Sequence, residues 1–169
     1  MTFYNKATGT EQIALVKGRI DPCCPTLVRM HALNPFGDMF GEDSSRGHML
    51  SRSMEMIAEQ GSGVVVVINR DRADAFTTAV KMKAGEPIEF DMEELRDYGV
   101  GAMILADLGV HDMVLLTNTH HSLVGLEGHG LRVIEERAVE PAARSRDLPQ
   151  QDARQSATAI ERRQASASL

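Results

Sequence analysis

Apolar residues recur at helical spacing in two long segments of the chain. The first segment spans residues 49–58, and Gly61 stands where the C-terminal cap of such a helix belongs. The second opens at Asp91, which forms a capping-box pattern with Glu94, and its apolar positions continue to Gly109. Two amphipathic helices are therefore predicted, each with one face turned toward a core.

Short runs of aliphatic residues lie between and after these helices. Residues 64–68 form an unbroken run of valine and isoleucine, the pattern of a strand that is covered on both faces. Shorter strands are predicted at 113–116 and 131–135, with a short helix at 119–127 between them. This alternation predicts an α/β fold with a mixed, mostly parallel sheet and flanking helices.

Two further strands are predicted nearer the N-terminus. They span residues 12–20 and 26–32, and the proline-flanked turn 21–25 joins them, so we expect a hairpin. The segment 31–48 that follows is rich in turn residues and is long enough to count as a loop of functional type. Residues 69–90 predict a second loop with a partial helix near 75–82.

Length and composition fit one globular domain with an aliphatic core. The chain has 169 residues, of which 43% are hydrophobic and only 4% aromatic. Near residue 138 the composition changes to alanine, arginine, serine and glutamine with few large aliphatic residues. We therefore expect a folded domain over residues 1–137 and a disordered tail over residues 138–169.

Charge and the length of apolar runs exclude several classes of protein. A net charge of −6 disfavours a nonspecific nucleic-acid binder and a stable partner of anionic membranes. The longest apolar run, 64–68, is far shorter than the roughly 20 residues that span a bilayer, and the N-terminus lacks a secretory signal. A cytoplasmic location is expected. The adjacent Cys23 and Cys24 suit a turn rather than a disulfide framework.

Candidate chemistry lies where strands of an α/β sheet end, because ligands bind beyond those ends. The predicted strand ends place residues 31–48, 69–74 and 117–122 there, and none of these segments is a phosphate-binding glycine loop. Thr117 and Asn118 suit either an anion contact before a helix N-terminus or plain helix capping. Glu94 and Arg96 suit either phosphate or base chemistry or a solvated helix face. The six histidines show no i, i+4 pair and no cysteine partners, so they predict no zinc site.

Several blocks of residues occur in an order and at spacings typical of a known enzyme family. These blocks are Leu15-Val-Lys-Gly18, Leu27-Val-Arg-Met-His31, Gly37-Asp38 with Phe40-Gly41, Leu95-Arg-Asp-Tyr-Gly-Val-Gly-Ala-Met-Ile-Leu105, Leu108-Gly-Val110, Leu115-Leu-Thr-Asn118 and Gly125-Leu-Glu-Gly128. From about residue 11 to residue 137 the chain resembles GTP cyclohydrolase II. The resemblance implies a zinc enzyme of riboflavin biosynthesis that opens the imidazole ring of GTP and releases formate and pyrophosphate. It also implies frequent fusion behind a 3,4-dihydroxy-2-butanone 4-phosphate synthase domain.

The chain departs from the family at the positions that the resemblance assigns to zinc. Asn34, Ser45 and Gly47 stand where the family has three cysteines, and none of them can supply a thiolate. The family's Arg-Gln-Glu-Gly-Arg-Gly run is replaced by Asn-Arg-Asp-Arg-Ala-Asp at 69–74, and its lysine after Leu-Leu-Thr-Asn by Ser122. We therefore expect no zinc and no other resident cofactor.

Part of the family's site is retained. The resemblance places Arg29, His31 and Thr117 at nucleotide-binding positions. It places Arg96 at the nucleophile position and Glu94 where an aspartate proton acceptor is usual. These five residues are the remnants expected to matter if any nucleotide chemistry survives.

Three hypotheses follow from this mixture of kept and lost residues. The first is a degenerate domain, inactive in GTP ring opening, that forms a homodimer and serves as a structural or regulatory partner of a synthase domain. The second keeps the chain an enzyme, either an active GTP cyclohydrolase II or a nucleotide hydrolase that uses Arg96 and Glu94 with Mg²⁺ on a triphosphate. The third is a nucleotide sensor that binds GTP without turnover. The chain begins abruptly at a strand and lacks the family's C-terminal extension, so we expect it to be a piece of a longer fused protein.

Overall fold

The structure is a computed structural model that describes residues 1–6, 8–41, 47–70, 74–85, 93–118, 126 and 128–139. For Met82 and for residues 93–97 it describes the backbone alone. The predicted tail, apart from residues 138 and 139, lies outside the described residues, as do Asp91 of the predicted capping box and residues 119–125 and 127 of the predicted short helix.

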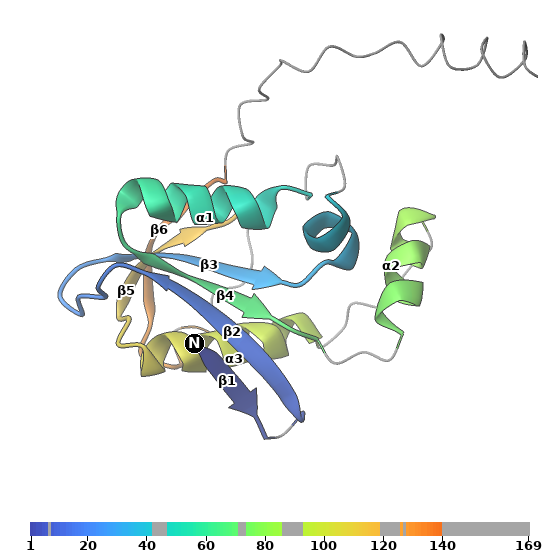
Figure 1. The fold of residues 1–169 in the computed structure, drawn as a ribbon. Coiled ribbons are helices and arrows are strands. Elements are labelled where there is room, and N and C mark those ends of the chain that lie inside the picture. Colours follow the sequence, from blue (N-terminus) through green and yellow to red (C-terminus); the bar gives the residue numbers. More distant parts are fainter. Residues whose placement is uncertain are drawn as a thin grey trace, which may run out of the picture.

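A six-stranded sheet with the order β1-β2-β4-β3-β5-β6 forms the centre of the fold (Figure 1). Its strands are β1 (Thr2–Asn5), β2 (Thr10–Lys17), β3 (Thr26–Ala32), β4 (Gly63–Ile68), β5 (Asp112–Leu116) and β6 (Arg132–Arg137). β3 runs parallel to β4 and to β5, and β5 runs parallel to β6. β1 and β2 extend the sheet in antiparallel pairing. The predicted mixed, mostly parallel sheet is confirmed.

The predicted hairpin of the second and third strands is wrong. β2 and β3 are consecutive in the chain, yet β4 lies between them and pairs with both. Residues 21–25 therefore belong to a connection between two strands that lie on either side of β4, and they do not form the turn of a tight hairpin. The unbroken valine run explains this outcome, since a strand without polar positions needs a neighbour on each edge and a layer on each face. β1, which the sequence pattern did not predict, forms the actual hairpin with β2.

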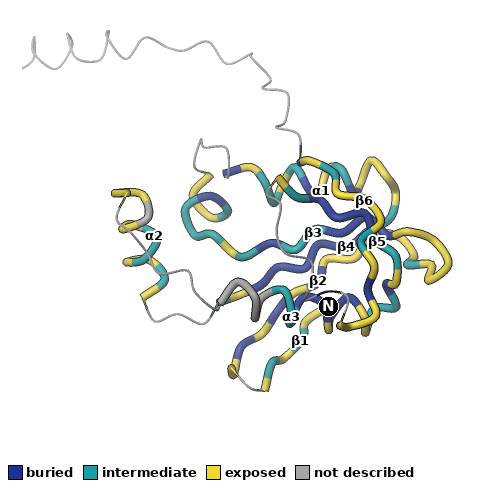
Figure 2. Tube along the Cα trace, turned by 180° about the vertical axis from the view of Figure 1, so that it is seen from behind, coloured by how far each residue is buried: buried dark blue, intermediate teal, exposed yellow. Residues whose placement is uncertain are grey.

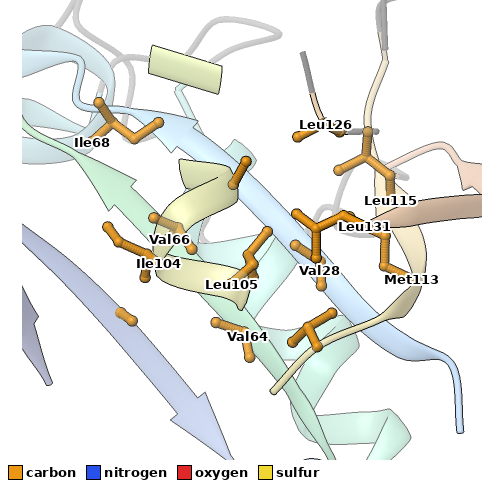
Figure 3. Packing of buried hydrophobic residues seen from close by; sticks show 13 residues of the cluster. Val28, Val64, Val66, Ile68, Ile104, Leu105, Met113, Leu115, Leu126 and Leu131 are labelled. Carbon is orange, nitrogen blue, oxygen red and sulfur yellow. The ribbon is translucent and has the colours of Figure 1, made fainter. Parts of the chain in front are cut away.

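Two helices cover the two faces of the sheet, so the core has two halves. α1 (Met49–Gln60) lies on one face and α3 (Glu93–Asp107) on the other (Figure 1). Ile57 of α1 packs with Val65 and Val67 of β4, whereas Leu105 of α3 packs with Val64 and Val66. Successive residues of β4 point to opposite faces, and all six are buried. Figure 3 shows the α3 half, and Figure 2 shows the buried strands at the centre.

The end of α1 follows the predicted capping chemistry. Gly61 adopts a left-handed conformation with φ of 89°, and its N–H donates to the carbonyl oxygens of Ile57 and Ala58. A side chain there would be strained, which is why glycine ends the helix. The predicted first helix is therefore confirmed to its C-terminal cap.

Two smaller elements lie beyond the ends of the parallel strands. η1 (Pro35–Met39) is a single π-helical turn inside the segment that the sequence predicted as a loop. α2 (Ala75–Lys83) confirms the predicted partial helix, and Lys83 Nζ lies 5.1 Å from the ring centroid of Phe36 on η1. Among the described residues, no helix is both long and apolar enough to cross a membrane.

Candidate functional site

The three residues that the sequence resemblance places at nucleotide-binding positions lie near the carboxyl ends of the parallel strands. β3, β4 and β5 are parallel, so their carboxyl ends meet at the same rim, where η1 follows β3 (Figure 1). Arg29 and His31 lie in the second half of β3, and Thr117 directly follows β5. The topology therefore brings together the three residues that the sequence assigned to nucleotide binding.

Arg29 lies partly buried between β3 and β5. Its Nη1 donates a 2.8 Å hydrogen bond to the carbonyl oxygen of Leu116, the residue before Thr117. Its Nε is buried and has no hydrogen-bond partner among the described residues. Burial lowers the pKa of this guanidinium, and the nearby Tyr98 and Asp38 oppose that shift. Arg29 thus offers a desolvated cation whose one described hydrogen bond goes to a neutral carbonyl.

His31 and Asp38 form a buried pair that connects β3 to η1. His31 Nε2 and Asp38 Oδ2 lie 2.8 Å apart, with the side chains 6% and 3% exposed. The same carboxylate oxygen accepts a 2.7 Å bond from the backbone N–H of Asn34. His31 Nδ1 and Asp38 Oδ1 are buried without a partner in the described part of the chain. One ring nitrogen of His31 is therefore held by an acid, and the other has no partner among the described residues.

Asn34, which the sequence resemblance places at the family's first cysteine position, is the N-cap of η1. Its Oδ1 accepts bonds from the backbone N–H groups of Phe36 and Gly37 at 3.1 and 3.4 Å. In return, Asp38 Oδ2 accepts the bond from the backbone N–H of Asn34, so the two side chains cap the turn reciprocally. The amide oxygen of Asn34 is committed to this turn.

The described residues do not fit a family-type zinc site. Gly47 has no side chain to offer, and Ser45 lies outside the described residues. Cys23 and Cys24 are exposed in the turn before β3, at the opposite end of that strand from Asn34. Across the described ranges, no group of three or more His, Cys, Asp or Glu side chains could hold a metal ion. We therefore derive no chemical step that uses zinc.

The backbone of Thr117 and the side chain of Asn118 contact the end of β6 and the segment that follows it. The N–H of Thr117 donates to the carbonyl oxygen of Arg137 at 2.9 Å. The amide of Asn118 pairs with Val139, accepting from its N–H at 2.6 Å and donating to its carbonyl oxygen at 3.0 Å. This pairing connects the segment after β5 to the segment after β6, so Asn118 has a structural role.

The backbone of Glu94 and Arg96 lies in the first turns of α3, and their side chains lie outside the described part of the chain. The roles that the sequence assigned to these two residues therefore stay predictions.

Sequence reasoning missed two polar residues that shape the rim. One is Asp38, the partner of His31. The other is Gln12, whose Oε1 accepts from the N–H of Asn69 at 2.6 Å and whose Nε2 donates to its carbonyl oxygen at 3.2 Å. Asp38 belongs to one of the family blocks, which was a usable signal. Gln12 gave none, because its partner is 57 residues away.

Comparison with known proteins identifies the family. The sequence profile described as GTP cyclohydrolase II matches residues 1–138. The chain belongs to the GTP cyclohydrolase II family. It is 40% identical over 146 residues to the riboflavin biosynthesis protein RibBA of Aquifex aeolicus, covering 79% of this chain and 36% of that protein. It is 35% identical over 147 residues to the monofunctional riboflavin biosynthesis protein RIBA 3, chloroplastic, of Arabidopsis thaliana, covering 78% and 28%.

A search of solved structures finds RibBX, a two domain 3,4-dihydroxy-2-butanone 4-phosphate synthase from A. baumannii. The TM-score is 0.47 at 24% sequence identity, and the match covers 79% of this chain and 33% of that one. The chain thus spans about a third of the length of the relatives it matches, 36% for the Aquifex protein. The resemblance drawn from the sequence blocks is confirmed as membership of the GTP cyclohydrolase II family.

Proposed function

We propose that this chain is a riboflavin-biosynthesis domain of the GTP cyclohydrolase II family that has lost GTP ring opening. The observation that carries the proposal is the role of Asn34, whose side chain caps η1 at the position of the first family cysteine. An amide oxygen held by two backbone N–H groups is a poor replacement for a thiolate, the ligand that zinc prefers. Gly47 adds no donor at another of these positions.

Loss of the metal removes the group on which the family's reaction depends. Zinc in such a site would supply a Lewis acid and an activated water. In this proposal the domain therefore acts as a structural or regulatory partner of a 3,4-dihydroxy-2-butanone 4-phosphate synthase, and it self-associates as a homodimer. Relatives named as riboflavin biosynthesis proteins support this context, because the matched part is only 36% of the Aquifex protein and leaves room for other domains.

Retained nucleotide recognition is the second candidate function, and Arg29 is the observation that favours it. The partly buried guanidinium of Arg29 makes no ion pair with any described residue, and it lies beside Leu116, which precedes Thr117. A phosphate group is the natural counter-ion for such a desolvated cation. This candidate, a GTP-binding domain without turnover, predicts that Arg29→Ala abolishes GTP binding.

The test is a single incubation of the purified chain with GTP, Zn²⁺ and Mg²⁺, in which formate and the diaminopyrimidine product are followed. We expect neither product above a control without protein. Formation of both would establish an active GTP cyclohydrolase II, and phosphate release without formate would support the nucleotide hydrolase that uses Arg96 and Glu94. Equilibrium binding of GTP, compared with Arg29→Ala, then separates a sensor from a purely structural partner.

A further inference from the structure

Packing does not explain the two cysteines of this chain. Cys23 and Cys24 are adjacent in the sequence, and both are free and exposed in the structure. Free cysteine is among the residue types most often buried, where it packs as a small apolar side chain. An exposed cysteine contributes no such packing, so its reactivity is the property that matters. The pair therefore points to thiol chemistry.

The short turn before β3 holds both cysteines on one piece of exposed backbone. The N–H of Cys24 donates to the carbonyl oxygen of Asp21 at 3.0 Å, and the N–H of Cys23 donates to Asp21 Oδ1 at 2.9 Å. Pro22 and Pro25 lie on either side of the pair, and the fixed φ of proline restricts the backbone there. The turn thus presents two neighbouring thiols to solvent together.

The two thiols differ in their surroundings. Cys24 Sγ donates to Asp21 Oδ2 at 3.8 Å. Cys23 Sγ makes no hydrogen bond to any described residue. Cys23 is therefore the thiol available for the first step of an exchange reaction, and Cys24 lies beside it for the second.

This turn is separate from the candidate functional site. Arg29 and His31 lie in the second half of β3, toward η1, whereas residues 21–25 precede its first residue, Thr26 (Figure 1). Within the described ranges, no three His, Cys, Asp or Glu side chains could hold a metal ion, so the pair is not part of a metal site of that size. Any chemistry of the two thiols is therefore independent of the proposed function.

We propose that Cys23 and Cys24 form a redox-active vicinal dithiol that reacts with low-molecular-weight disulfides such as glutathione disulfide. The thiolate of Cys23 attacks one sulfur of the reagent, which forms a mixed disulfide on Cys23 and releases one thiolate. The thiolate of Cys24 then attacks Cys23 Sγ, closes a disulfide between the neighbours and releases the second thiolate. The two cysteines lose two electrons to the reagent, and their two protons pass to the released thiolates.

The disulfide between neighbours is easily reduced again. Consecutive Cα atoms lie about 3.8 Å apart across a trans peptide, whereas disulfides usually join Cα atoms about 4.4–6.8 Å apart. A disulfide outside that range is strained, and strained or exposed disulfides are the labile ones. The pair therefore suits a reversible redox site rather than a permanent crosslink.

Exchange with glutathione tests the proposal on the full chain. The reduced protein is incubated in glutathione buffers of increasing disulfide content and quenched in acid, and its remaining thiols are labelled with N-ethylmaleimide. Intact mass spectrometry then counts the labels. We expect the reduced chain to take up two maleimide groups. The oxidised chain should take up none, carry no glutathione and run as a single chain on a non-reducing gel.

Serine variants provide matched controls, because both positions are exposed and the substitution changes one atom. Cys24→Ser should stop at the mixed disulfide, with one glutathione held on Cys23. The mixed disulfide of the wild type should decay at least about tenfold faster, since its second step is intramolecular. Far-ultraviolet circular dichroism checks that each variant keeps its fold.

Binding of phenylarsine oxide gives a second measurement that involves no disulfide. One arsenic joins two neighbouring thiols and releases water, so the wild type should retain one arsenic per chain after desalting. Cys23→Ser and Cys24→Ser should each retain none.

Independent thiols would give different results. A wild type that keeps glutathione as long as Cys24→Ser does, or that loses arsenic as readily as the serine variants, would overturn the proposal. These assays do not involve zinc or GTP, so failure of the redox site is distinguishable from failure of the proposed loss of activity.

Discussion

The centre of the sheet and the rim at the ends of its parallel strands are stabilised in different ways. At the centre, every residue of β4 is buried, and aliphatic side chains from α1 and α3 pack on its two faces. At the rim, single polar side chains hold loop backbones. Gln12 holds Asn69, Asn118 holds Val139, and Asn34 caps η1.

This difference indicates where a family can change its chemistry. Buried aliphatic contacts are numerous and shared, so no one of them specifies a reaction. A polar residue at the rim has one or two partners, and replacing it alters the local site while the core stays packed. In this chain the sequence matches the family profile over residues 1–138. Asn34, which the sequence resemblance places at a family zinc position, caps η1 instead.

The largest effect is expected at the centre. Leu105 of α3 is fully buried, and Leu105→Ala should lower the free energy of unfolding by about 2–5 kcal/mol, since it removes buried surface and leaves a cavity. Urea unfolding followed by circular dichroism measures the loss. Val80→Ala on α2, where the side chain is 55% exposed, serves as the control and should cost less than about 0.5 kcal/mol. Equal losses in the two variants would contradict a packed centre.

A smaller effect is expected at the contact between the segments after β5 and β6. Asn118→Ala leaves the N–H and C=O of Val139 without their partner, which should cost about 2 kcal/mol. Asn118→Asp keeps the acceptor for the N–H but loses the donor, so its loss should be smaller. Hydrogen exchange of the Val139 amide reports on the contact directly. Unchanged exchange in Asn118→Ala would show that the side chain does not hold this segment.

The cap of η1 should contribute less. Asn34→Ala removes the acceptor for two backbone N–H groups and should cost about 1 kcal/mol. Asn34→Asp should cost only about a few tenths, because aspartate caps as well as asparagine. Denaturant unfolding with and without a chelator measures both variants. If the chelator destabilised the wild type, a bound metal rather than the cap would hold the turn.

The smallest effect is expected at the exposed pair of Asp112 and Arg132. Arg132 lies 2.6 Å from the carboxylate of Asp112 and lowers the pKa of that group below its usual 3.8. A lowered pKa means that the pair stabilises the fold above the usual carboxyl pKa, and that this contribution disappears as the pH falls through the folded pKa. Arg132→Gln should thus have a lower free energy of unfolding than wild type above about pH 6. At pH values far below about 4, the two proteins should be equally stable. A difference that grows in acid would contradict this assignment.

Much of the framework could be predicted from the sequence, because its signals are local. The valine run of β4, the apolar spacing of α1 and the glycine cap at Gly61 each specify their own element, and all three predictions are confirmed. The neighbour of each strand is not a local property. The predicted hairpin of β2 and β3 failed for this reason, since β4, which separates them, begins 31 residues after β3 ends (63 − 32).

The site was predictable only in part. The family blocks located Arg29, His31 and Thr117, and the structure places them at one rim. The partners of these residues were not predictable. A carboxylate that holds His31 and a carbonyl that holds Arg29 depend on how η1 and β5 approach β3, which no spacing encodes. The cap formed by Asn34 could be recognised only once the turn after it was known to be helical.

The central claim is that this domain keeps the family framework without the family metal. The most direct test is the zinc content of the purified chain, measured by elemental analysis after saturation with Zn²⁺ and desalting. The same measurement is made on a variant that restores the family cysteines, Asn34→Cys with Ser45→Cys and Gly47→Cys. The account predicts no bound zinc in the wild type and one per chain in the variant. One tightly held zinc per wild-type chain would contradict it.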